Sequence, residues 1–187
     1  MRIVGGSLGG RVLRAPAGVD TRPTSEKVRE AVFNILPDVE GMAVLDVFAG
    51  SGAVGIEALS RGAAHATFFD LGKPALAAVR GNLRDLGLES RATVVAGDSV
   101  SLAARHVPPR PWDLVFVDPP YRSDLATRAV LALPTERLSP DPVIVIEHDR
   151  RNAPPETLGS LIRTDERRYG DTMVSFYRLA SAIEVPA

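Results

Sequence analysis

Residues 118–121 combine one acidic, two rigid and one aromatic side chain: Asp118, Pro119, Pro120 and Tyr121. The carboxylate of Asp118 and the backbone carbonyl of Pro119 could each accept a proton of an amino group. The two prolines restrict the backbone and lack N–H donors, which holds these acceptors in a stiff arrangement. The ring of Tyr121 offers a face on which a flipped base could stack. The set suits chemistry on an exocyclic amino group of a base, a poor nucleophile whose lone pair is delocalised into the ring.

A glycine-rich segment follows the apolar run at residues 43–48. Gly50 and Gly52 let the backbone turn sharply and approach a ligand closely, and Gly55 lets the following helix pack near a sheet. Backbone amides at the start of that helix favour an anionic group. We expect this loop, with Phe48 and Ser51, to bind a cofactor. Taken alone, the glycine pattern fits a dinucleotide enzyme as well as a methyltransferase.

Polar residues at the ends of predicted strands help to choose between these two cofactor classes. Asp70, about 20 residues after Gly50, could accept hydrogen bonds from both hydroxyls of an adenosine ribose. Asp98, followed by Ser99, could accept one from an adenine amino group while a nearby backbone amide donates to the ring. Asp46 stands where a dinucleotide enzyme usually has an apolar residue, and it could accept from the ammonium of a methionine moiety. With residues 118–121, these acids favour S-adenosylmethionine.

The elements that must position these residues alternate between strands and helices. The alternation predicts an α/β fold with a parallel sheet and helices on both faces. The glycine loop would follow the first strand and Asp118 the fourth, at the edge of the sheet where such folds bind ligands. The expected strands are 43–48, 66–69, 93–96, 113–117 and 143–146, and the expected helices are 53–61, 73–86, 99–106 and 125–133.

Both ends of the chain depart from this alternation. Residues 161–168 and 172–179 look like strands joined by a turn too tight for a crossover helix, so the last strand should run antiparallel to its neighbour. The pattern of residue types over 1–40 predicts an N-terminal extension, with a basic β-hairpin and a helix over 26–36. The catalytic domain would then span residues 41–180, and residues 181–187 would form a tail.

Composition places limits on the function. The 187 residues are 45% hydrophobic and contain no cysteine, which suits one domain and excludes disulfides and thiolate metal sites. The three histidines lack metal-ligand spacing, so we expect no metal. There is no long apolar run and no signal peptide, which fits a cytoplasmic protein without a membrane partner. Residues 1–35 hold six basic and three acidic side chains, which favours a polyanionic partner.

The order of these motifs resembles that of class I methyltransferases acting on amino nitrogens. Residues 2–6, 10–13, 21–24 and 28–36 are further similar to the RsmD-type 16S ribosomal RNA guanine-N2 methyltransferases, and the likeness runs from Arg2 to about Leu179. The resemblance implies a Rossmann-like sheet of seven strands with an antiparallel last strand. It also implies S-adenosylmethionine as methyl donor and, as substrate, a guanine of 16S rRNA in the small ribosomal subunit or its late assembly intermediate.

No room remains for a separate RNA-binding domain, so the basic hairpin and the rims of the crevice should choose the substrate. We expect Arg2, Arg11 and Arg14 to contact RNA phosphates, although the hairpin could instead cover a sheet edge. Arg22 and Thr24 would lie near the cofactor or the flipped base. Arg122 would belong to a lid over the base or to a simple helix cap. We expect the protein to be a monomer.

Three alternatives remain open from the sequence. The acceptor could be adenine N6, cytosine N4 or a protein glutamine amide, because residues 118–121 suit each of them. A nicotinamide oxidoreductase would need a hydride-transfer acid or base near the end of the fourth strand, and the sequence there has no histidine, lysine or serine–tyrosine–lysine set. A non-catalytic ribosome-assembly factor would not need an intact Asp118 and Tyr121.

Overall fold

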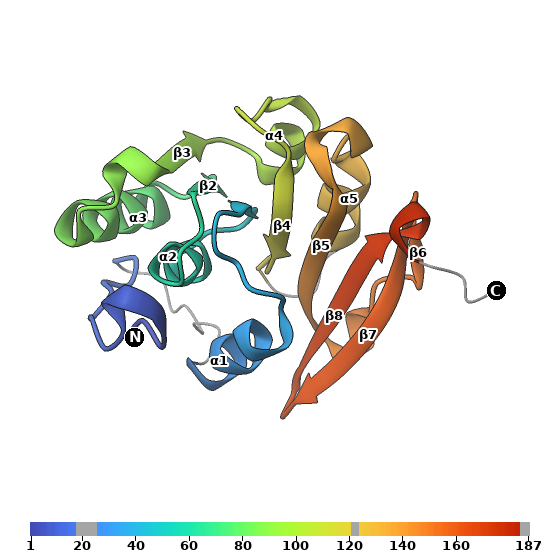
Figure 1. Ribbon diagram of the computed structural model, residues 1–187, viewed down its shortest axis with the longest axis horizontal. Helices are drawn as coiled ribbons and strands as arrows, with labels where there is room; N and C mark the ends of the chain where they lie inside the picture. Colours follow the sequence, from blue (N-terminus) through green and yellow to red (C-terminus); the bar gives the residue numbers. More distant parts are fainter. Residues whose placement is uncertain (18–25, 121–123, 184–187) are drawn as a thin grey trace.

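The computed structural model describes residues 1–17, 26–120 and 124–183 (Figure 1). Their centre is an eight-stranded sheet in the order β3-β2-β1-β4-β5-β8-β7-β6. The strands are β1 (Ala43–Asp46), β2 (His65–Asp70), β3 (Ala92–Ala96), β4 (Trp112–Val117), β5 (Leu138–Asp149), β6 (Thr157–Leu158), β7 (Leu161–Tyr169) and β8 (Thr172–Leu179). The α-helices are α1 (Glu26–Ile35), α2 (Ala53–Ser60), α3 (Lys73–Leu86), α4 (Ser99–Arg105) and α5 (Leu125–Ala132).

Strands β1 to β5 form the parallel part of the sheet. β1 pairs with β2 on one side and with β4 on the other, and β3 and β5 extend the two sides. The chain therefore builds outwards from β1 in one direction and then crosses back to build in the other. This reversal between β1 and β4 is the topological switch point at which open α/β sheets bind ligands.

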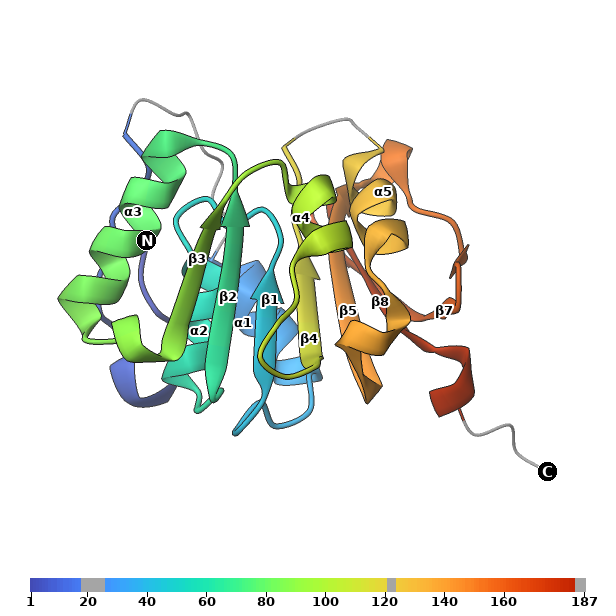
Figure 2. The same ribbon diagram turned by 90° about the horizontal axis from the view of Figure 1, so that it is seen from above.

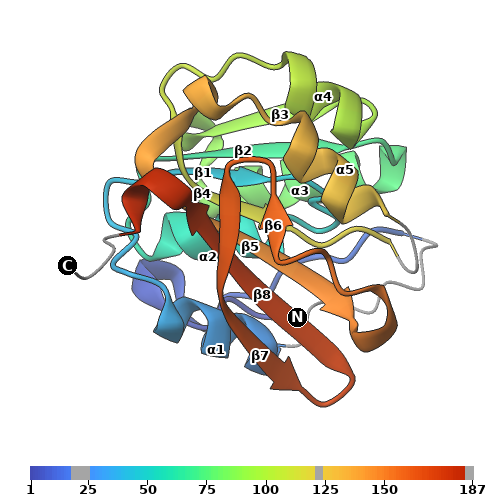
Figure 3. The ribbon, with the colours of Figure 1, turned by 90° about the vertical axis from the view of Figure 1, so that its right-hand side faces the viewer.

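The far end of the sheet is antiparallel, as the sequence predicts. β8 lies between β5 and β7 and runs antiparallel to both, which Figure 3 shows. The two-residue β6, which the sequence does not indicate, adds an eighth strand at the edge. β5 is also longer than the predicted 143–146. Prolines at 140 and 142 argue against a central strand there, and the β4–β5 pairing accommodates them in an irregularity between Trp112 and Leu114.

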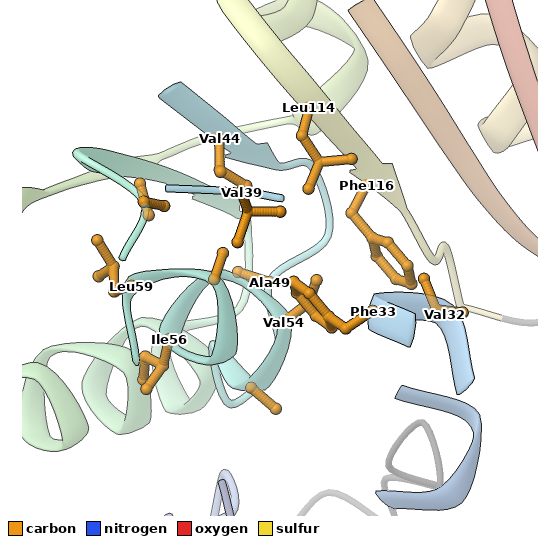
Figure 4. Packing of buried hydrophobic residues seen from close by; sticks show 14 of the residues in the cluster. Val32, Phe33, Val39, Val44, Ala49, Val54, Ile56, Leu59, Leu114 and Phe116 are labelled. Carbon is orange, nitrogen blue, oxygen red and sulfur yellow. The ribbon is translucent and has the colours of Figure 1, made fainter. Parts of the chain in front are cut away.

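Helices cover both faces of the sheet, because successive side chains of a strand point to opposite sides. Val44 and Leu114 join one hydrophobic cluster with α1, α2 and α3, while Leu45 and Val115 join a second cluster with α4 and α5 (Figure 2). Figure 4 shows the first cluster, in which Phe33 of α1 packs beside α2. In the part of the chain that the structure describes, no helix has the length and apolar character needed to cross a bilayer.

Residues 1–17, called the N-terminal segment below, fold back on themselves as expected of a hairpin. Arg2 and Val12 form an antiparallel bridge, and the turn between them contains a 3-10 helix, Gly6–Leu8. The buried side chains of Ile3 and Leu13 belong to the same hydrophobic cluster as α2 and α3. Backbone groups of the segment are hydrogen bonded to side chains of α2 and α3. The segment therefore packs against these helices.

Candidate active site

Three carboxylates gather at the carboxyl edge of the sheet. Asp46 ends β1 and stands in register with Phe68 of β2 and Phe116 of β4. Asp70 and Asp118 each lie two residues beyond those partners, so the three acids occupy neighbouring strand ends. Both Asp118 and Asp70 raise the pKa of Asp46 through their negative charge. The cofactor-binding and catalytic motifs expected from the sequence thus meet at the switch point.

Asp46 has an unusual ionisation state for a carboxyl group. It is 2% exposed, and this burial raises its pKa from 3.8 to about 7. A hydrogen bond of 3.2 Å from the backbone N–H of Gly55 opposes the shift. Burial thus disfavours the charged form of Asp46, and a cation placed beside it would favour that form. This suits a site that receives a positively charged ligand group.

The glycine loop has the geometry that the sequence predicts. Gly50 has φ 55° and Gly52 φ 78°, in the left-handed region that favours glycine, and Gly52 directly precedes α2. Asp70 shapes the loop, since its carboxylate accepts the N–H of Gly50 at 2.9 Å and that of Gly72 at 2.7 Å. A side chain built on Gly50 would meet no described atom within 4 Å. The loop therefore presents open backbone on which a ligand can rest.

Asp98 and Ser99 stand at the start of α4, directly after β3. Asp98 is the N-cap of the helix, and its side chain accepts the N–H of Ser101 at 2.8 Å. Hydrogen bonds from Ser101 hold the pKa of the exposed Asp98 below its usual value, so it is ionised at neutral pH and acts only as an acceptor. Ser99 is buried. The capping role was not expected from the sequence, and it fixes the direction of the carboxylate.

Ser51 and Phe48 belong to the loop but differ in their surroundings. Phe48 is half-buried and packs against the cluster under α4 and α5. Ser51 is buried, and its backbone carbonyl accepts a hydrogen bond of 2.9 Å from the side chain of Asn82. Asn82 also donates to the carbonyl of Arg14 at 3.1 Å and accepts from its N–H at 2.8 Å. Sequence reasoning missed Asn82, whose signal was an amide on the apolar face of α3.

The residues expected to do chemistry follow β4. Asp118 and Pro119 are half-buried and Pro120 is exposed, so the edge is accessible at this point. The rest of the predicted base and cofactor contacts lie outside the described residues: Tyr121, Arg122, Arg22 and Thr24. Among the residues that are described, no cluster of histidine, aspartate and glutamate side chains could hold a metal ion.

The arginines predicted to bind RNA are on the surface. Arg2, Arg11 and Arg14 are all exposed, and Arg14 forms an ion pair with Asp85 of α3. Arg29 differs from them, although it contributes to the basic count of residues 1–35. It is 1% exposed and bonded to Glu57, so its charge is not available to a polyanion. Sequence pattern alone does not separate a buried arginine from a solvated one.

Glu57 of α2 is the second residue that sequence reasoning missed. It is 0% exposed and accepts hydrogen bonds of 2.7 Å from the backbone N–H groups of Val4 and Gly5. The guanidinium groups of Arg29 and Arg61 neutralise it. A buried charge needs such partners, and together they anchor the N-terminal segment to the helix that begins at the glycine loop.

Known proteins are similar to this sequence over nearly its whole length. The family described as Conserved hypothetical protein 95 matches residues 1–178. The Bacillus subtilis protein YlbH is 43% identical over 182 residues, which are 95% of this chain and 98% of that one. The chain belongs to this family, the RsmD-type methyltransferases.

Other members resemble the chain in sequence and in fold. Ribosomal RNA small subunit methyltransferase D of Escherichia coli is 38% identical over 157 residues, covering 83% of this chain and 78% of its own. The solved structure of the Escherichia coli protein yhhF has a TM-score of 0.84 and 34% identity, and it covers 97% of this chain and 98% of its own. The mostly parallel sheet with antiparallel last strands is therefore the Rossmann-like class I methyltransferase fold.

Proposed function

We propose that this protein transfers a methyl group from S-adenosylmethionine to the exocyclic N2 of a guanine in 16S ribosomal RNA. The observation that carries the proposal is the meeting of the glycine loop and Asp118 at adjacent strand ends, in a chain of the RsmD-type family. The name of the Escherichia coli relative supports the small-subunit RNA as substrate. The proposal includes action in the cytoplasm, as a monomer, on the small subunit or its late assembly intermediate.

The residues at the switch point fit S-adenosylmethionine, which supplies an electrophilic methyl group on a sulfonium centre. The open backbone at Gly50 gives room for the ligand, and the buried Asp46, whose charged form a neighbouring cation would favour, suits the cationic end of a methionine moiety. Asp70 keeps lone pairs for ribose hydroxyls beyond those used by Gly50 and Gly72. Asp98, held as a helix cap, is the acceptor proposed for the adenine amino group.

Asp118 and the Pro119 carbonyl would hold the two protons of the acceptor amine. This arrangement would favour a tetrahedral nitrogen, so that the lone pair is less delocalised into the ring and can point towards the methyl group. Most of the rate gain then comes from positioning and electrostatics, and no proton has to leave the amine before the methyl group moves. The amine becomes far more acidic once it is alkylated, so Asp118 or water takes the proton afterwards.

The test is transfer of tritium from labelled S-adenosylmethionine. Naked small-subunit RNA and small subunits from cells lacking this protein would be compared as substrates, and the product would be digested to nucleosides. We expect N2-methylguanosine, made on the subunits. Another methylated base would contradict the guanine-N2 assignment, and transfer to a glutamine amide would contradict the RNA substrate. Two results together would indicate a non-catalytic assembly factor. Wild-type protein would transfer no methyl group, and an Asp118→Ala variant would still support ribosome assembly.

A further inference from the structure

Helix α3 carries a row of positive charge on its solvent side. Lys73, Arg80 and Arg84 follow one another at spacings that place them on one face of a helix, and all three are exposed. At 1.5 Å per residue the row extends over roughly 16 Å. A surface hollow beside it is lined by both arginines and by residues of β3. We call Lys73, Arg80 and Arg84 the α3 row.

The positive charges of the α3 row destabilise helix α3. Lys73 is the first helical residue, where the helix dipole disfavours a cation, and the first turn contains no acidic residue. Arg80 and Arg84 stand four residues apart, so their like charges repel. Arg84 lies in the last turn, where the dipole favours a cation, so the unfavourable terms are the position of Lys73 and the repulsion between the two arginines. Departures of this kind from local rules are expected where a surface serves function.

The charge of the α3 row is also largely uncompensated. Within the described residues, Lys73 and Arg80 form no ion pair, and Arg84 reaches Glu89 only at 3.9 Å between exposed side chains. Such exposed pairs contribute little. The other end of the sheet differs, because three arginines on β7 and β8 are paired with carboxylates: Arg163 with Glu156 and Glu166, Arg167 with Asp165, and Arg178 with Asp141.

The position of the α3 row connects it to the candidate site. Lys73 directly follows Gly72, whose N–H is bonded to Asp70 at the carboxyl edge of the sheet. The N-terminal segment runs beside α3 (Figure 2), with the backbone of Arg14 bonded to Asn82 and its side chain paired with Asp85. These contacts place Arg14, which is paired with Asp85, beside the helix that carries the α3 row.

We propose that the α3 row binds RNA phosphates and extends the RNA interface from the N-terminal segment along α3. The proposal rests on the proposed function, since it concerns the same RNA substrate. Lysine and arginine side chains bind phosphates without reading sequence, so the row contributes affinity and orientation while the edge of the sheet selects the base.

The test compares two double variants that remove the same charge. Lys73→Ala with Arg80→Ala alters the α3 row, and Arg167→Ala with Arg178→Ala alters the other end of the sheet. Binding to small subunits from cells lacking this protein would be measured over a range of salt concentrations. We expect the α3 variant to bind more weakly, with a salt-dependence slope smaller by about 2, because two phosphates are no longer neutralised. The control should keep the wild-type slope, and both variants should keep wild-type affinity for S-adenosylmethionine.

An α3 variant with the wild-type affinity and slope would overturn the proposal, as would an equal loss in the control. The proposed function fails separately, when wild-type protein transfers no methyl group to the subunits. If wild-type protein transfers no methyl group but still binds the subunits, the comparison of salt-dependence slopes tests the role of the α3 row independently of the proposed function. If it binds neither subunits nor naked small-subunit RNA, both proposals are overturned.

Discussion

Asp118 is the side chain on which the proposed chemistry depends most directly. It lies half-buried just beyond β4, beside the strand end that carries Asp46. Asp118→Asn keeps the shape but replaces a charged acceptor with an amide, so we expect kcat to fall by about 10²- to 10³-fold. Affinity for S-adenosylmethionine should stay close to wild type. Single-turnover methyl transfer and calorimetric titration measure the two quantities, and an Asn variant of unchanged kcat would contradict the role of Asp118.

Asp46 should make the stability of the free protein depend on pH. Burial raises its pKa to about 7 in the folded state, against 3.8 for an ordinary aspartate. Between these values the folded protein holds a proton that the unfolded chain has released, so the free energy of unfolding falls as the pH rises from about 4 to about 7. Above that range the destabilisation is complete.

Asp46→Asn removes this ionisation and tests it. We expect the variant to gain stability over wild type near pH 8, with a smaller gain near pH 5, where wild-type Asp46 is largely protonated. Urea denaturation at the two pH values measures the difference. An equal gain at both would show that the pKa of Asp46 is not raised. The variant should also bind S-adenosylmethionine more weakly, because the carboxylate is lost.

The glycines of α2 and α3 show how elements constrain single positions. A side chain on Gly55 would place its Cβ 2.3 Å from the ring of Phe68, so α2 can lie this close to β2 only with glycine there. Gly81 of α3 has no described atom within 4 Å of the same position, and its φ is ordinary.

The two substitutions by alanine should act in opposite directions. Gly55→Ala should lower the free energy of unfolding by about 1–3 kcal/mol through overpacking. Gly81→Ala should raise it by about 0.5–1 kcal/mol, since alanine is the better helix former. Thermal denaturation of the pair measures both effects. A Gly55→Ala protein as stable as wild type would show that α2 can move away from the sheet without loss.

Much of the element order could be predicted from the sequence, and the failures have physical reasons. The bounds of α3 match the prediction because Gly87 adopts the left-handed conformation that ends the helix. β5 was predicted too short because a strand irregularity accommodates its prolines. β6 has only two residues, which is too few for a periodic pattern. Local sequence signals describe local structure, while these departures depend on the neighbouring strand.

The site shows the same division. Asp46, Asp70 and Asp118 could be placed at one edge because the ends of parallel strands meet there. Glu57 and Asn82 were missed, because their partners are backbone groups about 50 to 70 positions away, such as Gly5 and Arg14. The amide on the apolar face of α3 indicates a buried polar group, but a single sequence does not say which distant backbone groups it contacts.

Asn82 connects two parts of the whole molecule, the N-terminal segment and the glycine loop. Asn82→Ala would leave the carbonyl of Ser51 and both backbone groups of Arg14 without this partner. We expect a loss of about 2–3 kcal/mol in the free energy of unfolding. In wild type, S-adenosylmethionine should increase the protection of the Arg14 amide from hydrogen exchange, and in the variant it should not.

Asn152→Ala is a matched control for this experiment, because Asn152 is exposed and its hydrogen bonds within the described residues are local ones, to Asp149. It should keep both the wild-type stability and the effect of S-adenosylmethionine on the Arg14 amide. The contrary result would be that S-adenosylmethionine protects the Arg14 amide equally in wild type and in the Asn82 variant. That result, whatever the loss of stability, would show that the segment and the loop respond to the ligand independently.

The place of β8 in the sheet has a consequence for how the protein is made. Among the strands of the described sheet β8 is synthesised last, yet it lies between β5 and β7, and its Ser175, Phe176 and Tyr177 are buried. Until residues 172–179 have left the ribosome, β5 keeps an unpaired edge and the core beneath it stays open. Exposed strand edges are where nascent chains join one another. The interval between translation of β5 and of β8 is therefore when a chaperone, or slow synthesis, most affects the yield of folded protein.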